Sequence, residues 1–416
     1  MYRIWNFITQ YSLLLVGGAL AALIWANMAP DSYHHLVHLP LWIDAPIGLI
    51  EQHDGQPMRV LTLHFLINDV LMALFFAMAA KEVWEAVILK DGSLRGRRAL
   101  TPLIATLGGM AGPVLVYLTL AASLGILAEV GRGWAIPTAT DIAFSYLVGR
   151  IVFGARHPAI GFLLLLAIAD DAGGLAILAV FYPTGDVVPL WLLVSLAAAA
   201  GVWLLANWLP RWLDGDDPAR GWSTRARRVL AAWPYIIAGC ISWYAFYRAG
   251  LHPALGLLPI IPAIPHAERD FGVFAADEAG ATDLLNRMEH ALKLPVQFVL
   301  LAFGLMNAGV EFSAISAPTW LVLAGLVIGK PLGITLFGWF AANVLRLGLP
   351  EGMVLRDLPV VGLVAAIGFT VALFVAAVAF PSGPVQDAAK MGALFSLGSA
   401  VLAIAAGRMM RITRQG

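Results

Sequence analysis

Long apolar runs follow one another along nearly the whole chain, with short polar segments between them. A helix needs about 20 mainly apolar residues to cross the hydrocarbon core of a bilayer, and about twelve such runs lie between residues 12 and 407. Only 12% of the residues are charged, whereas soluble domains carry roughly a quarter. The sequence therefore predicts an all-α polytopic membrane protein with about twelve transmembrane helices, and it excludes a soluble enzyme.

The basic residues are distributed unevenly between the polar segments. If the N-terminus lies in the cytoplasm, twenty Lys and Arg fall in cytoplasmic segments, and only Arg59, Arg132 and Arg248 fall in outer ones. Cytoplasmic loops carry the excess of Lys and Arg in membrane proteins, so we expect both termini to be cytoplasmic. Lys+Arg and Asp+Glu balance at 26 each, which gives no indication of a nucleic-acid partner.

Two adjacent carboxylates stand inside one apolar run. Asp170 and Asp171 occur in the string LLLLAIADDAGGLAILAVF, and a charge near the bilayer centre is costly enough to indicate a functional site. Two carboxylates this close cannot both ionise at low cost, and hard cations prefer oxygen ligands. The pair would therefore hold either protons or a cation such as Na⁺. The alternative is a structural carboxylate pair that is salt-bridged to Lys330.

Two further ionisable residues lie within predicted spans. Asp141, in GWAIPTATDIAFSYL, follows Pro137, which interrupts the helix, and Thr140 offers a neutral oxygen ligand. An Asp at the N-terminus of a half-helix is stabilised by the helix dipole, although a Pro-kinked helix with a capping Asp is a simpler alternative. Lys330 only partly balances the aspartates, and this acidic total favours a cation or protons as cargo.

A second interruption, at Gly368 and Thr370, lies in the apolar run 358–380. Gly- or Pro-interrupted segments at corresponding positions of two halves indicate the binding site of a transporter. We expect a single transmembrane transporter domain, 1–416, with inverted-topology repeats at 99–182 and 319–408. Each repeat would contain one broken helix, and the two broken helices would cross at the midplane.

These residues together resemble the NhaA-type sodium/proton antiporters. The matching strings occur in the family's order and are GWAIPTATDIAF at 133–144, LAIADDAGGLAILAVFY at 166–182, MNAGV at 306–310, GKPLGI at 329–334 and IGFT at 367–370. The resemblance implies an electrogenic antiporter, which is a secondary active transporter and not an enzyme. It would export Na⁺ or Li⁺ in exchange for protons, serve pH and sodium homeostasis, and need no cofactor.

The resemblance also implies roles for single residues. Asp170 and Asp171 would bind the cation and protons, with Asp171 as the principal cation ligand and Asp170 paired with Lys330. Thr140 would contribute an oxygen, and Asp141 and Lys330 would compensate opposite dipole ends of the broken helices.

The family also implies a location and a partner. Its members lie in the bacterial inner membrane and form homodimers through a hairpin on the outer side, which maps to the loop 29–60 in this sequence.

The string KEVWEA at 81–86 departs from the family's usual LEVKRE, because Trp84 and Glu85 stand at positions that are usually basic. Further along, Lys293 stands where a histidine is frequent. This region is associated with pH activation in the family, so we expect an activity–pH curve that is shifted from that of typical members. The candidate residues for a pH response are Glu82, Glu85, Glu289, His290 and Lys293.

A passive cation channel and an intramembrane aspartyl protease are the alternative functions. Acidic residues can line a cation pore, but broken helices beside a buried Lys favour alternating access. An aspartyl protease needs two carboxylates that share a proton across the substrate, whereas Asp170 and Asp171 are covalent neighbours. Proton coupling separates these classes, because only an antiporter moves protons against a cation gradient.

Overall fold

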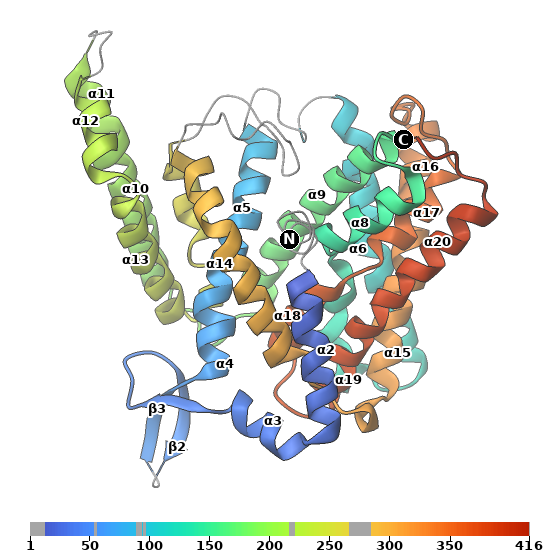
Figure 1. The fold of residues 1–416 in the computed structure, drawn as a ribbon, viewed down its shortest axis with the longest axis horizontal. Helices are drawn as coiled ribbons and strands as arrows, with labels where there is room; N and C mark the ends of the chain where they lie inside the picture. Colours follow the sequence, from blue (N-terminus) through green and yellow to red (C-terminus); the bar gives the residue numbers. More distant parts are fainter. Residues whose placement is uncertain are drawn as a thin grey trace, which may run out of the picture. The chain divides into compact units, whose positions relative to one another are not determined.

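The computed structural model describes residues 13–53, 56–88, 94, 97–215, 221–265 and 284–415. The N-terminal segment that we expect in the cytoplasm lies outside the described residues. The chain forms two compact units: unit 1 comprises Met1–Pro40, Ser93–Ile177 and Leu300–Gly416, and unit 2 comprises Leu41–Gly92 and Leu178–Val299. Both units consist mainly of helices (Figure 1).

Unit 1 contains the helices on which most of the candidate site residues stand. In chain order its elements are α2 (Leu13–Met28), α3 (Pro30–Val37), α6 (Arg97–Ser123), α7 (Leu127–Val130), the 3₁₀ helix η2 (Gly131–Thr138), α8 (Ile142–Phe153), most of α9 (Pro158–Phe181), the end of α14 (Leu284–Asn307), η7 (Phe312–Ala314), α15 (Ala317–Ala324), η8 (Gly325–Gly329), α16 (Lys330–Trp339), η9 (Phe340–Val344), α17 (Asp357–Ala365), α18 (Phe369–Ala379), α19 (Pro384–Phe395), η10 (Ser396–Gly398) and α20 (Ser399–Met409).

Unit 2 combines a small sheet with further helices. Its elements are β1 (Pro40–Ile43), β2 (Leu49–His53), β3 (Gln56–Thr62), α4 (Leu63–Phe65), η1 (Leu66–Leu71), α5 (Met72–Ile88), α10 (Pro189–Trp203), η3 (Leu204–Trp208), α11 (Leu209–Asp214), α12 (Gly221–Leu230), α13 (Trp233–Ala249), η4 (Pro253–Leu255), η5 (Leu258–Ala263) and the greater part of α14.

Within the described residues, seven helices are long and apolar enough to cross a membrane. The pair α17 and α18 passes the same test together and is bent by 52° at the break between them. Three apolar helices are shorter: Leu13–Met28, Ile142–Phe153 and Pro253–Ala263. A mainly helical chain with several potential spans is thus confirmed, whereas the total of twelve spans and the inverted repeats stay predictions.

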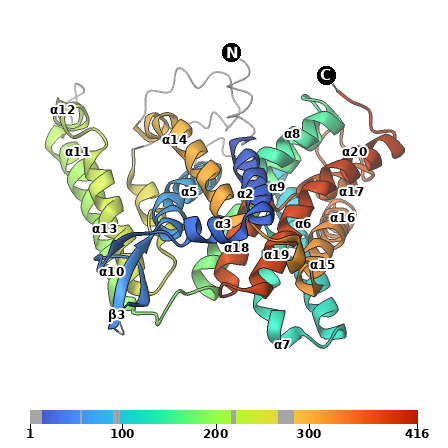
Figure 2. The same cartoon turned by 60° about the horizontal axis from the view of Figure 1, so that its bottom comes forward.

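The sheet in unit 2 departs from the all-α fold that the sequence predicted. Its strands lie in the order β1-β3-β2, and β2 pairs with β3 in antiparallel register, Leu49 opposite Val60. The strands include branched and aromatic residues, which favour extended backbone: Trp42, Ile43, Ile50, Val60 and Thr62. The hydroxyl of Tyr247 on α13 donates to Gly48 O (2.8 Å) and accepts from Arg59 Nη1 (3.2 Å), which fixes the sheet to the end of that helix (Figure 2).

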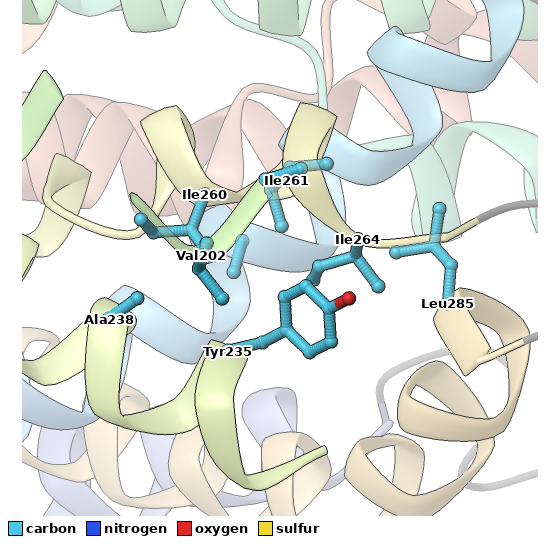
Figure 3. Packing of buried hydrophobic residues seen from close by; sticks show 9 residues of the cluster. Val202, Tyr235, Ala238, Ile260, Ile261, Ile264 and Leu285 are labelled. Atoms are coloured by element: carbon cyan, nitrogen blue, oxygen red, sulfur yellow. The ribbon is translucent and has the colours of Figure 1, made fainter. Parts of the chain in front are cut away.

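The core of unit 2 joins α10, α13, η5 and α14. Figure 3 shows that the ring of Tyr235 lies among aliphatic side chains from the other three elements. Its hydroxyl donates to Asn207 Oδ1 at 2.6 Å, and Asn207 Nδ2 donates to Ala263 O at 2.6 Å. The Tyr235 hydroxyl and the Asn207 amide are therefore hydrogen-bonded where they enter this core, as membrane burial requires. The buried residues of this core include Val202, Tyr235, Ala238, Ile260, Ile261, Ile264 and Leu285.

Four glycines allow α6 and α16 of unit 1 to approach until their backbones touch. A Cβ added at Gly112 would lie 2.2 Å from Gly329 O, and one added at Gly333 would lie 1.9 Å from Gly108 O. Small residues four positions apart permit this close packing of membrane helices. The contact fixes the start of α16, where Lys330 stands between Gly329, the last residue of η8, and Gly333.

Gly333→Ala is expected to destabilise the protein by about 1–3 kcal/mol, because the added methyl group would overlap the main chain of α6. The control is Gly161→Ala on α9, where an added Cβ meets nothing within 4 Å, and where alanine should be neutral or slightly stabilising. Thermal unfolding of the purified protein in detergent measures both variants. Equal stability of the two variants would contradict the close contact.

Candidate functional site

Asp170 lies in a buried cluster of unit 1. Both Asp170 and Lys330 have side chains that are 0% exposed, and Lys330 Nζ lies 2.8 Å from Asp170 Oδ2. The hydroxyl of Thr140 donates to the same carboxylate oxygen at 2.7 Å. The other oxygen, Oδ1, is buried and makes no hydrogen bond with the described residues. The expected ion pair is therefore present, and Oδ1 is the oxygen that protein donors leave unsatisfied.

Lys330 also contacts the interrupted segment that precedes α8. Its Nζ donates to Thr138 O at 2.5 Å, and Thr138 is the last residue of η2. The C-terminal end of a helix carries partial negative charge. Two acceptors, a carboxylate and a helix-terminal carbonyl, thus stabilise the buried ammonium group.

Thr140 links α9 to the break after α17. Its hydroxyl lies 2.7 Å from Asp170 Oδ2 and 3.0 Å from Ala365 O. A hydroxyl has one hydrogen but two lone pairs, so Thr140 can donate fully to only one of these acceptors at a time. Its oxygen therefore remains able to accept a hydrogen bond or to bind a cation.

Asp141 caps two helices at once. Its Oδ1 accepts from Phe144 N at 3.2 Å at the start of α8, and its Oδ2 accepts from Thr370 N at 3.4 Å and from the Thr370 hydroxyl at the start of α18. Its own N–H donates to Ile367 O at 2.7 Å. Carboxylates stabilise helix N-termini, so the capping role considered for Asp141 is observed, at two helices rather than one.

Asp171 follows Asp170 on α9 and is half-buried. Successive residues of an α-helix point about 100° apart, so the two carboxylates leave α9 in different directions. Asp171 nevertheless lies close enough to act on Lys330 through its charge. The structure thus gathers Asp170, Thr140 and Lys330 by direct contact, with Asp171 beside them.

The candidate pH-response residues stand on α5 and α14 in unit 2. Lys81 Nζ lies 2.6 Å from Glu85 Oε2 and 2.5 Å from Glu289 Oε2, and all three side chains are largely buried. Two of the five candidates therefore share one lysine. Glu82 is half-buried on α5, whereas His290 and Lys293 are exposed on α14.

Sequence reasoning missed Lys81 as the partner of these glutamates. Lys81 stands four residues before Glu85, and this spacing brings side chains together on a helix. The sequence could therefore have predicted this ion pair. The bond to Glu289 joins residues 208 positions apart, and no local pattern could indicate it. The carbonyl groups of Thr138 and Ala365 were also missed, because the sequence does not show which main-chain carbonyl groups bind side chains.

The arrangement can bind hard cations or protons. Asp170 contacts the Thr140 hydroxyl and the Lys330 ammonium group, and the carbonyl oxygens of Ala365 and Thr138 bond these two partners. Carboxylate, hydroxyl and carbonyl oxygens are the ligands that hard cations prefer. Among the described residues, no group of three or more His, Cys, Asp or Glu could hold a metal ion. An aspartyl protease dyad does not fit, because the partner of Asp170 is a lysine.

Several helices that are apolar enough to cross a membrane, together with a buried cluster of charged residues, are the features of a polytopic membrane protein with a buried ionisable site. The family model described as Na⁺/H⁺ antiporter 1 matches residues 4–409, and the chain belongs to this family. It is 65% identical, over all of both chains, to a protein named Na⁺/H⁺ antiporter NhaA from Jannaschia sp. (strain CCS1). It is 47% identical to a protein of the same name from Desulfitobacterium hafniense (strain DSM 10664 / DCB-2), over 98% of this chain and 96% of the relative.

Among solved structures, the sodium proton antiporter MjNhaP1 from Methanocaldococcus jannaschii matches with 15% identity and a TM-score of 0.48, over 98% of each chain.

Lys330→Ala is expected to destabilise the protein by about 3–5 kcal/mol, because it leaves the buried Asp170 without its counter-charge. Adding Asp170→Asn to this variant should recover part of the loss, since the uncompensated charge is then removed. Thermal unfolding in detergent measures the effect, with the exposed Lys293→Ala as control. An effect of Lys330→Ala no larger than that of the control would argue against the pairing.

Proposed function

We propose that this chain is an electrogenic Na⁺(Li⁺)/H⁺ antiporter, which exports sodium in exchange for protons and serves pH and sodium homeostasis. The observation that carries the proposal is the carboxylate of Asp170, which is ion-paired through Oδ2 while the buried Oδ1 lacks a donor among the described residues. An ionised oxygen buried in this way is costly, so a proton or a cation binds there. Membership of the Na⁺/H⁺ antiporter 1 family supports sodium as that cation.

In the proposed cycle, the ionised aspartate pair takes Na⁺ from the cytoplasmic side, with Asp171 as the principal ligand. The oxygen of Thr140, which already bonds Asp170, completes part of the coordination. Because a cation on Asp170 competes with Lys330 for the same carboxylate, binding of Na⁺ weakens the ion pair. The site then opens to the outer face, protons displace Na⁺, and the protonated site returns.

We infer that the interruptions η2–α8 and α17–α18 are the two broken helices of an inverted repeat, 99–182 and 319–408, in a protein of about twelve spans. Asp141 supports this inference because it bonds Ile367 O and Thr370 across the two interruptions. It lies at helix N-termini, and Lys330 lies at the C-terminal end of η2. Their charges therefore compensate opposite dipole ends, and Gly368 and Thr370 form the second break.

We propose a homodimer that forms through the outer segment 29–60, in a bacterial inner membrane with both termini in the cytoplasm. The sheet supports the dimer, because Trp42 and Ile50 are 56% and 69% exposed and apolar side chains on an open sheet indicate an interface. The distribution of Lys and Arg supports the orientation.

The direct test is proton flux in proteoliposomes with an imposed pH gradient. Addition of Na⁺ or Li⁺ should dissipate the gradient, and Asp171→Asn should abolish this flux while leaving the unfolding temperature close to that of the unaltered protein. The loss follows from removing the principal cation ligand. Asp186→Asn, at an exposed position between α9 and α10, is the control and should transport normally. Retained exchange in Asp171→Asn would overturn the site, and absence of coupled flux in the unaltered protein would overturn the function.

The departure at 81–86 leads to a second prediction. Two glutamates share Lys81, so Glu85→Gln removes one negative charge from this cluster and leaves Lys81 paired with Glu289 alone. Because this changes the charge balance of the cluster, the pH at which half-maximal exchange is reached should shift by roughly half a unit or more. Flux measured between pH 6 and 9 tests this, with Lys293→Gln as control. The activity–pH curve of the unaltered chain should also differ from that of family members with LEVKRE at this position. Identical curves would contradict the proposed role of these residues in the pH response.

A further inference from the structure

In unit 1 a 3₁₀ segment, η10, stands between α19 and α20. Ser396 stands at this junction, is 0% exposed and uses its hydroxyl twice. Its Oγ donates to Ala393 O at 2.6 Å and accepts from Gly368 N at 3.2 Å. The hydroxyl therefore connects the end of α19 to the break between α17 and α18.

The N–H of Gly368 needs this acceptor. Gly368 is the residue that precedes α18, and the first N–H groups of a helix have no partner within it. Where water is excluded, each unsatisfied backbone group costs several kcal/mol. Asp141 accepts from Thr370 N, and Ser396 accepts from Gly368 N. Side chains from two different segments thus hold the start of α18.

The atoms around Gly368 are packed so closely that the break between α17 and α18 has little room to move. A Cβ added at Gly368 would lie 2.8 Å from the side chain of Leu326 and 3.1 Å from Ala139 O. On the opposite side of the break, Asp141 N donates to Ile367 O and the Thr140 hydroxyl lies 3.0 Å from Ala365 O. The same Thr140 hydroxyl bonds Asp170, so displacement of the break would move a residue of the candidate ion site.

We propose that Ser396 is a positioning residue for ion binding: its hydroxyl holds the break between α17 and α18 in the place where Thr370 meets Asp141 and Ala365 meets Thr140. This inference rests on the proposed function, since it concerns the affinity of the same site. Ser396 does not touch the ion. It acts through Gly368, and a hydroxyl is the group that accepts and donates at once in so small a volume.

Ser399 provides a matched control three residues further along. It is 1% exposed, at the start of α20, and its Oγ makes no hydrogen bond with the described residues. Ser396→Ala and Ser399→Ala therefore remove the same atom from equally buried positions. Only the first removes hydrogen bonds.

The experiment compares Na⁺-driven proton flux of the full chain and both variants in proteoliposomes. Ser396→Ala should raise the apparent KM for Na⁺ roughly three- to tenfold, the scale of one lost hydrogen bond, while the maximal rate per folded protein stays within about twofold. Ser399→Ala should leave both values unchanged. A loss of folded protein with unaltered KM, or equal effects of the two substitutions, would overturn the positioning role.

Amide hydrogen exchange of the segment 365–371 gives a readout that does not depend on transport. Exchange should accelerate in Ser396→Ala and not in Ser399→Ala, and equal protection in both would overturn the inference. If the unaltered protein shows no Na⁺-coupled flux, the proposed function fails, and the exchange data still decide whether Ser396 holds the break. If Ser396→Ala yields no folded protein, Ser396→Thr, which keeps the hydroxyl, must restore folded and active protein; its failure to do so also overturns the inference.

Discussion

The arrangement of unit 1 depends on the buried ion pair between Asp170 and Lys330. Two charges removed from water are costly, and their attraction offsets this cost only if the geometry is good and further hydrogen bonds satisfy both groups. Thr140 supplies such a bond to the carboxylate, and the carbonyl of Thr138 supplies one to the ammonium group. The pair also requires that α16 approach closely, which the glycines facing each other between α6 and α16 permit. Substitution at a glycine that never touches an ion can therefore alter the site.

Interrupted helices provide the polar groups that an intact helix would keep for itself. An α-helix satisfies its N–H and C=O groups internally, so only its ends can bind other groups. The break before α8 exposes the carbonyl of Thr138 to Lys330, and the break before α18 exposes the N–H groups that bind Asp141 and Ser396. Such irregular backbone is tolerated at membrane depth only where it is buried in protein, as it is here. The polar centre of unit 1 therefore follows from where its helices stop.

Sequence alone could predict the charged residues of this site, because a charge inside an apolar segment has a high energetic cost. Asp170, Asp171 and Lys330 stand out because charges are expensive inside apolar runs, and Pro137 indicated the first interruption. The residues at 40–62 did not themselves indicate strands, because the strands are short and their exposed apolar residues give no clear alternation; only the family resemblance implied a hairpin in the segment 29–60. The bond between Lys81 and Glu289 and the role of Ser396 depend on tertiary contacts, which no local pattern specifies. A main-chain acceptor such as Thr138 O cannot be identified from the sequence.

The two charged clusters differ in how they respond to a proton. Asp170 and Lys330 form a one-to-one pair, so a proton on Asp170 removes the only carboxylate within ion-pair distance of Lys330 in the described part of the chain. Lys81 instead bonds two carboxylates, Glu85 and Glu289, and a proton on either leaves the other ionic bond in place. Protonation thus breaks the first cluster and only weakens the second. In the proposed cycle, the first kind of response suits a site that releases its cation completely, and the second suits the proposed pH-responsive cluster, which would adjust activity over a range of pH.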